Sequence, residues 1–534
     1  MKPTRGFSPT GLIGLACCLS SAMAYAELTD ATQTTPHVPG GAIGKSLAQQ
    51  IGAGRGSEVA PGSSIYLINR DPARSIRRGR QLFQRKFTLD QGQGPRVSRD
   101  ASGDIQENPA LGAGLADSCA ACHGRPRGSA GSGGDVATRP DSRDAPHLFG
   151  LGLVEMLGDE ITQDLRAIRA RAIAAAARSG RSVTLPLASK GIRYGAITAS
   201  PSGNVDTSRV DGIDPDLRNR PFFAQGAEFS MRAFAVGAFK DEMGLEAPDP
   251  VLCGASDPSH PAAAVTPAGL VLDPALDTIK RPPVCSPTAD GDGDGAVNEI
   301  DGALVDHMEF YLLNYFKPGT GQVGERAQEG LRIMRDIGCT ACHVQNLRIE
   351  HDRRVADLRT EFDPERGIFN RLFATATTLF NVVDDGQSYP KLLPKRRSFL
   401  VENLFADFKR HDLGPAFHER NYDGTLQTKF MTEPLWGVAT TAPYGHDGRS
   451  INLDEVILRH GGEAQAAKAA YSRLSDSNSR KVLEFLSTLV LFPPDDTAST
   501  LNPGHPGTSN PQDPAEHGSI NLGALFQIPA EGAE

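Results

Sequence analysis

Two short segments each combine a closely spaced pair of cysteines with a histidine. Cys339 and Cys342 are followed directly by His343, and the pair Cys119 and Cys122 by His123. In this pattern two thiols form thioethers with the vinyl groups of a haem c, and the histidine binds the iron as its proximal ligand. A zinc site built from the two cysteine pairs is the alternative. The histidine after each second cysteine favours two covalently bound haems.

The second haem needs a group on its other side, and His460 is the favoured candidate. The segment from Asn452 to His460 has helical spacing of its apolar residues, with Asn452 as N-cap and two glycines after the end. This spacing puts His460 on the apolar face. A core-facing histidine is by default a hydrogen-bonded core residue, but a segment that must pack a haem makes iron ligation the better interpretation.

His446 is the competing histidine for the same iron. It lies in a predicted turn, next to Asp447 and close to Arg449. We interpret His446 as a residue that supports the site or binds a haem propionate. Arg449 is a natural propionate partner, because guanidinium groups bind carboxylates with paired hydrogen bonds.

An acidic segment from 290 to 301 follows the twelve-residue calcium loop of an EF-hand, with Gly295 at the sharp turn. Its predicted calcium ligands are Asp290, Asp292, Asp294, the carbonyl of Ala296, Asn298 and Asp301. An aspartate at the last position reaches less far than the usual glutamate, so the loop predicts a modest affinity. A solvated acidic turn is the alternative interpretation.

The first residues indicate export. Lys2 and Arg5 precede a short apolar run, and an Ala-Tyr-Ala sequence ends at Ala26. This pattern predicts a cleaved signal peptide over residues 1–26 and a periplasmic protein, the compartment in which haem c is attached. The run is too short to be a membrane span.

After the leader and haem segments, two cysteines remain, Cys253 and Cys285. In an oxidising compartment such a pair predicts a disulfide, with two buried thiols as the alternative. The overall composition is that of an ordinary globular protein, with a formal charge of −9. It gives no indication of a nucleic-acid partner, and a mildly acidic surface suits the docking of a basic electron donor.

The elements around these motifs are expected to be mainly helical. Helical patterns cover 76–87 and 324–337, each ahead of one haem segment. This weak repeat predicts a mainly α fold, with two tandem cytochrome c-like haem domains and long ordered loops. The predicted divisions after the signal peptide are an N-terminal arm over 27–75, haem domains over 76–318 and 319–500, and a flexible tail over 501–534.

Several C-terminal segments resemble a known family. Residues 435–437, 442–449 and 460–464 are similar to the C-terminal haem domain of the di-haem cytochrome c peroxidase superfamily. The similarity is greatest to its di-haem oxidoreductase branch, whose members are also called thiol oxidoreductases. Residues 148–155 and 409–414 match as well, so the resemblance covers about 76–492.

The resemblance implies that the N-terminal haem is reactive and that the C-terminal haem relays electrons. His460 stands where bacterial peroxidases have a methionine ligand, which implies a bis-histidine centre of low potential. The tryptophan that those peroxidases place between the haems has no counterpart at its usual position. The single tryptophan, Trp436, lies in the C-terminal segment instead and is predicted to contact the cofactor there.

Three functions follow as alternatives. The first is a peroxidase that reduces hydrogen peroxide, with Glu155 or His147 as acid and base, and a small periplasmic cytochrome c or cupredoxin as electron donor. The second is a dioxygenase that cleaves a hydrophobic substrate with dioxygen, as rubber oxygenases do. The third is a di-haem electron carrier without catalytic activity.

Overall fold

The structure is a computed structural model that describes residues 47–97, 111–112, 114, 116–123, 145–257, 259, 263–315, 317–367, 371–421 and 423–491. The predicted signal peptide, the first part of the predicted arm and the predicted tail lie outside these residues. Where the predicted N-terminal arm is described, it contains helices.

Twelve α-helices lie in the described residues. They are α1 (Leu47–Ile51), α2 (Ser64–Arg70), α3 (Pro72–Gln84), α4 (Cys119–His123), α5 (Leu151–Ser179), α6 (Met231–Met243), α7 (Pro250–Ala255), α8 (Gly302–Leu313), α9 (Glu325–Asp336), α10 (Leu453–Arg459), α11 (Gln465–Tyr471) and α12 (Asp476–Leu486). Short 3-10 helices are η1 (Leu89–Gln91), η2 (Cys339–Ala341), η3 (Val438–Thr440) and η4 (Gly462–Ala464).

The strands of the described residues are short and pair antiparallel in small sheets. The only sheet of three strands among them contains β3 (Val183–Ser189), β4 (Ile192–Ala199) and β5 (Val205–Asp206). The two-stranded pairs are β1 (Arg96–Val97) with β2 (Leu111–Gly112), β6 (Ala264–Val265) with β7 (Val271–Leu272), β8 (Gly319–Thr320) with β19 (Leu489–Val490), β9 (Leu347–Ile349) with β14 (Phe399–Val401), β10 (Ala356–Phe362) with β11 (Leu372–Thr378), β12 (Phe380–Val383) with β13 (Lys391–Pro394), β15 (Arg410–His411) with β18 (Phe430–Met431), and β16 (Glu419–Arg420) with β17 (Leu426–Gln427).

The prediction of a mainly α fold with two tandem cytochrome c-like domains is therefore wrong. Segments that were expected to be loops form hairpins, and the β3–β4 hairpin shows why. Its turn residues Lys190 and Gly191 both have positive φ, at 50° and 81°, which is the turn geometry that matches the twist of two paired strands. The polar residues of such hairpins made them look like loops. The division at residue 318 stays a prediction.

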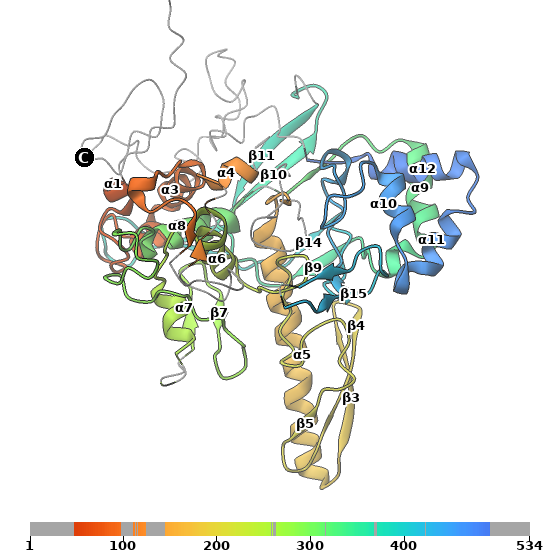
Figure 1. Ribbon diagram of the computed structural model, residues 1–534, viewed down its shortest axis with the longest axis horizontal. Coiled ribbons are helices and arrows are strands. Elements are labelled where there is room, and N and C mark those ends of the chain that lie inside the picture. Colours follow the sequence, from red (N-terminus) through yellow and green to blue (C-terminus); the bar gives the residue numbers. More distant parts are fainter. Residues whose placement is uncertain are drawn as a thin grey trace, which may run out of the picture.

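Helix α5 is the longest element and lies between the other helices (Figure 1). Helices α1–α3 and α6–α8 gather on one side of it, and α9–α12 on the other. The largest hydrophobic core extends from Ile68 to Leu491 in sequence, and a smaller core lies between α9 and α12. Because Gly330 of α9 has no side chain, α9 can approach α12: a Cβ there would lie 1.9 Å from the Lys481 carbonyl oxygen.

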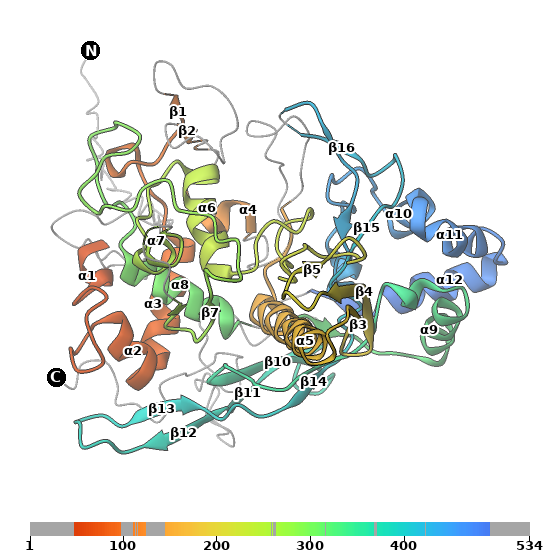
Figure 2. The ribbon, with the colours of Figure 1, turned by 90° about the horizontal axis from the view of Figure 1, so that it is seen from below.

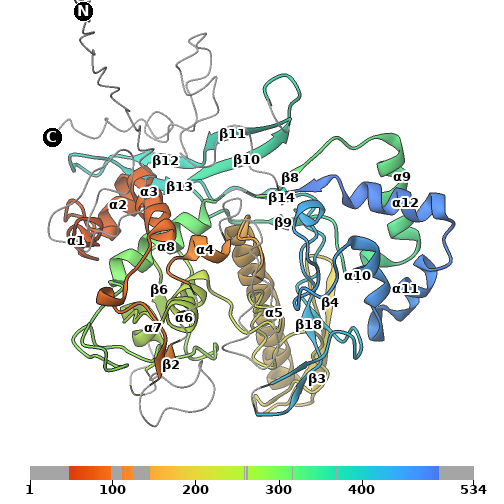
Figure 3. The ribbon, with the colours of Figure 1, turned by 45° about the horizontal axis from the view of Figure 1, so that its top comes forward.

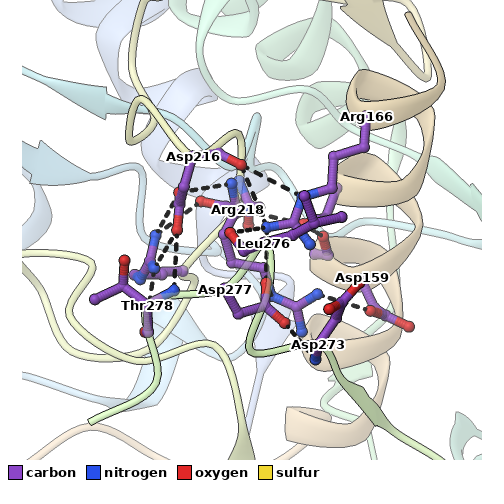
Figure 4. Close-up of polar contacts among 12 residues, drawn as sticks. Asp159, Arg166, Asp216, Arg218, Asp273, Leu276, Asp277 and Thr278 are labelled. Carbon is purple, nitrogen blue, oxygen red and sulfur yellow. Dashed lines mark hydrogen bonds and ion pairs between the residues drawn. The ribbon is translucent and has the colours of Figure 1, made fainter. Parts of the chain in front are cut away.

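Ion pairs attach two loops to α5. Arg166 on α5 contacts Asp277 at 2.7 Å, and Arg218 lies between Asp159 on α5 and the same Asp277 (Figure 4). Arg218 and Asp277 are both buried. Buried charges need such partners, because an unpaired ion in a low-dielectric interior is costly.

A second set of charges holds α6, α7 and α8 together. Arg232 of α6 has no exposed surface and forms ion pairs of 2.7, 2.5 and 2.7 Å with Asp249, Asp306 and Glu309. Arg232 is thus the hub of a completely buried cluster. Nearby, a disulfide joins Cys253 of α7 to Cys285, the pair that the cysteine count indicated.

The two halves of the chain also contact each other away from α5. The β12–β13 hairpin extends along α2, as Figure 2 shows. Arg70 of α2 pairs with Asp385 in the hairpin at 2.5 Å. Within the described residues, no helix is both long and apolar enough to cross a membrane.

Candidate haem site

The first cysteine–histidine motif forms the short helix α4, which lies near the start of α5 (Figure 3). Both Cys119 and Cys122 are free thiols in the structure and partly exposed. The Nδ1 atom of His123 donates to the carbonyl of Pro146 at 2.7 Å. Burial lowers the pKa of His123, so the ring is neutral, with its proton on Nδ1. The remaining nitrogen, Nε2, is the one that an iron would use.

The second motif repeats this arrangement with a different backbone. Cys339 begins the 3-10 helix η2, after Gly338 in the left-handed conformation (φ 88°). Burial lowers the pKa of His343 to about 4, and its Nδ1 donates to the carbonyl of Phe405 at 3.0 Å. Again Nε2 is left for a metal. Among the described residues, no group of potential metal ligands combines the two cysteine pairs, which disfavours a shared zinc site.

His460 ends helix α10 and lies near His343. The predicted N-cap is confirmed, because the Asn452 side chain accepts from the backbone of Glu455 at 2.8 Å. His460 is partly buried, and its Nδ1 donates to the Val456 carbonyl at 2.8 Å. A positive charge on His460 would contribute to the lowered pKa of His343. With Nδ1 held by the backbone, Nε2 is the nitrogen that an iron would use, and ligation by His460 stays a prediction.

His446 is engaged elsewhere. Its ring stacks on Phe430 with a centroid distance of 4.0 Å, and its Nε2 lies 2.9 Å from a carboxylate oxygen of Glu419. Both polar side chains are almost fully buried. Arg449 is exposed and lies 3.5 Å from Asp447. These positions favour a supporting role for His446, and the binding of a propionate by Arg449 stays a prediction.

Sequence reasoning gave no role to His411, which is central to the second site. Its two ring nitrogens contact Asp407 at 2.9 Å and Glu463 at 2.7 Å. Burial lowers the pKa of His411, but hydrogen bonds with Asp407, Cys342 and Glu463 outweigh it and raise the pKa to about 11. His411 is therefore a buried cation held by two carboxylates, and it lies close to Cys342.

The same contacts explain two segments on which the family resemblance rests. Glu463 follows Gly461 and Gly462, three residues after His460, and also accepts from the backbone of Asp412 at 3.0 Å. A Cβ on Gly462 would lie 2.1 Å from the Asp412 carbonyl oxygen. The glycines allow the two segments to touch, and Glu463 then binds both His411 and the backbone of Asp412. The sequence contains both segments, but only the tertiary structure shows that Glu463 of one contacts His411 of the other.

His147 and Trp436 connect the two halves of the site. The Nε2 of His147 donates to the Trp436 carbonyl at 3.1 Å. Burial lowers the pKa of His147 to about 4, so its Nδ1 is an unprotonated, buried atom, and it has no hydrogen-bond partner in the described residues. The Trp436 ring is buried against Gly150: a Cβ there would lie 2.7 Å from the ring.

A continuous route of backbone and hydrogen bonds thereby joins the two motif histidines. It consists of four hydrogen bonds, and adjacent residues of the chain link each hydrogen bond to the next. They connect His123 to Pro146, His147 to Trp436, Leu435 to Leu404, and Phe405 to His343. The Leu435 bond to Leu404 measures 3.0 Å. No sequence pattern indicates this route, because its carbonyl groups are present in every residue.

Glu155 lies inside α5 and both of its oxygens are engaged. One accepts from Arg353 at 2.7 Å and the other from the backbone of Met231 at 2.7 Å. Burial raises the pKa of Glu155 to about 7. The predicted role of Glu155 or His147 as acid and base stays a prediction, and the contacts of Glu155 favour a role in positioning α5.

The predicted calcium loop folds around its first aspartate. Asp290 accepts from the backbones of Gly293, Asp294 and Gly295, and Gly295 has φ 95°. The last predicted ligand has a different partner: Asp301 caps α8 by accepting from the Ala303 backbone at 2.8 Å.

The remaining predicted ligands of the loop divide between these two ends. Asp292 and Asp294 lie in the same group of carboxylates, and Ala296 donates its backbone N–H to Asp294 at 2.6 Å. Asn298 donates to Asp301 at 3.4 Å. The C-terminal end of the loop therefore contacts the start of α8 through Asp301.

Comparison with known proteins identifies a segment that contributes His411 and His460 to the second site. Residues 397–489 match the family described as "Di-haem oxidoreductase, putative peroxidase". No curated protein matches the chain. A di-haem family implies haem cofactors, and the chain offers what two haems need: paired thiols and imidazoles whose Nδ1 atoms are already held. The predicted resemblance is thus confirmed, and residues 397–489 carry the signature of the di-haem oxidoreductases.

Proposed function

We propose that the protein is a periplasmic di-haem c oxidoreductase that reduces hydrogen peroxide at the N-terminal haem, with electrons relayed through the C-terminal haem. The family match supports an oxidoreductase of the peroxidase type. The two cysteine–histidine motifs support covalent attachment, and the leader-like first residues support export. The haems would supply redox-active iron and, at the first one, a position where peroxide binds.

The observation that carries this proposal is the bonded route between His123 and His343. Electrons must pass between the two haems, because reduction of one peroxide to two waters consumes two electrons and two protons. The donor would be a small periplasmic cytochrome c or cupredoxin, and its electrons would enter at the second haem.

Chain residues hold both ends of that route. Phe405 fixes the ring of His343, and Pro146 fixes the ring of His123. His147 makes the only connection of the route that depends on a side chain other than the motif histidines, through its bond to Trp436. In this proposal His460 and His343 would together hold the second haem, and the first haem would be the one that reacts with peroxide.

The test is a stopped-flow reaction of the fully reduced protein with one equivalent of hydrogen peroxide under anaerobic conditions. Both haems should become oxidised, two per peroxide, with the second following the first. Persistent ferrous spectra would instead indicate an electron carrier. Oxidation only by dioxygen, with consumption of a hydrophobic alkene, would indicate a dioxygenase.

The route itself is tested by His147→Leu. This change removes the bond to the Trp436 carbonyl and should slow oxidation of the second haem at least several-fold relative to oxidation of the first. His351→Leu is the matched control, since the His351 side chain is 67% exposed. Equal rates in both variants would remove His147 from the route.

A further inference from the structure

Two buried glutamates lie beside the acidic loop at 290–295. Glu246 is 7% exposed and follows α6, and Glu299 is 5% exposed and precedes α8. Glu246 lies with Asp290 and Asp292, and Glu299 with Asp292 and Asp294, so that the oxygens of each group are within 4.8 Å of one another. The two groups share Asp292 and form one cluster of five carboxylates.

Each glutamate has one oxygen that the protein satisfies and one that it does not. Oε1 of Glu246 accepts from the backbones of Gly291 and Asp292, at 2.6 and 3.0 Å. Oε2 of Glu299 accepts from the backbone of Glu246. The other oxygen of each, Glu246 Oε2 and Glu299 Oε1, is buried without a hydrogen-bond partner in the described residues.

Acidic neighbours surround both buried glutamates. Burial raises the pKa of Glu299 to about 8, and the charged groups that contribute most to this are the acidic Asp294, Asp292 and Glu246. Burial likewise raises the pKa of Glu246 to about 7, with further contributions from Asp292 and Asp290. Buried carboxylates of this kind are stable when they are paired or when they coordinate a metal.

We propose that this cluster is a Ca²⁺ site whose ligands are Asp290, Asp292, Asp294, Glu246 and Glu299, rather than a loop closed by its twelfth residue. Ca²⁺ takes six to eight oxygen ligands in flexible geometry, and carboxylates are its preferred side chains. Asp301 is excluded from the set because it caps α8. Glu246 and Glu299, neither of which was a predicted ligand, take the place of Asp301 in this set.

The site would fix the segment that leads to the first cysteine–histidine motif. The carbonyl of Glu242 accepts from Ala116 at 3.2 Å, and that of Met243 accepts from Gly94 at 3.1 Å. Ala116 lies three residues before Cys119. A cation that clamps Glu246 to Glu299 therefore holds the end of α6 in the position that supports α4.

Isothermal titration of Ca²⁺ into the full-length, haem-loaded protein after chelation tests the proposal. Glu246→Gln and Glu299→Gln should each lower the Ca²⁺ affinity by about tenfold or more, because affinity follows the number of charged ligands. Asp301→Asn is the matched control: asparagine is also a good N-cap, so the affinity should stay within about twofold.

A second measurement separates loss of the site from misfolding. Without Ca²⁺, Glu299→Gln should melt at the wild-type temperature or above it, because the change neutralises a buried carboxylate. At the same Ca²⁺ concentration, the melting temperatures of the wild type and Asp301→Asn should rise more than those of the glutamate variants. Absence of Ca²⁺ binding in the wild type would overturn the proposal, as would an affinity that falls in Asp301→Asn but not in the glutamate variants.

Discussion

Gly150 is the position where one added methyl group should disturb the contact between the two halves of the site. It caps the N-terminus of α5 with φ 76°, where an alanine costs about 1–2 kcal/mol. The alanine Cβ would also lie 2.7 and 2.8 Å from two ring carbons of Trp436, whereas carbon atoms pack best at about 3.5–4.0 Å. Such overpacking adds about 1–3 kcal/mol, so Gly150→Ala should cost about 2–5 kcal/mol in all.

The same helix offers a matched control. Gly180 caps the C-terminus of α5 with φ 65°, and a Cβ there would meet nothing within 4 Å. Gly180→Ala should therefore cost only the backbone part, about 1–2 kcal/mol.

Urea unfolding measures both variants, and Trp436 gives a local signal because it is the only tryptophan. Its fluorescence should already differ in folded Gly150→Ala, since the ring must shift. If Gly150→Ala cost no more than Gly180→Ala, and the fluorescence were unchanged, the close packing of Trp436 on α5 would be refuted.

Two further predictions concern the second site. His460→Ala should convert one low-spin ferric signal to high-spin in low-temperature electron paramagnetic resonance, whereas His446→Ala should leave that signal in place; the reverse result would make His446 the ligand. The pKa of His411 is raised from 6.5 to about 11 in the folded state, because its bonds with Asp407, Cys342 and Glu463 outweigh burial. The stability that it contributes should be complete below about pH 6.5 and disappear as the pH rises toward 11. The difference in unfolding free energy between wild type and His411→Asn should therefore shrink between pH 6 and pH 10, and a difference that is constant with pH would contradict the charged pairing.

The sequence-based predictions that are confirmed depend on residues close together in the chain. The family resemblance rested on residues near His446 and His460, and the match over 397–489 includes both. The N-cap at Asn452 was predictable because capping depends on one side chain and a backbone group three residues away. The overall fold was not predictable in this way, since hairpins such as β10–β11 and β12–β13 have weak local patterns and depend on pairing between strands.

By itself, the sequence determined which side chains could bind haem, because thioether attachment and proximal ligation need fixed residue types at fixed spacing. Tertiary structure alone decided which groups support them. Phe405 and Pro146 act through backbone carbonyls that no residue type reveals, and His411 meets Glu463 across 52 residues of chain. Glu246 meets the acidic loop across 45 residues. Contacts of this kind depend on how distant segments pack, and packing is set by the whole core rather than by any one motif.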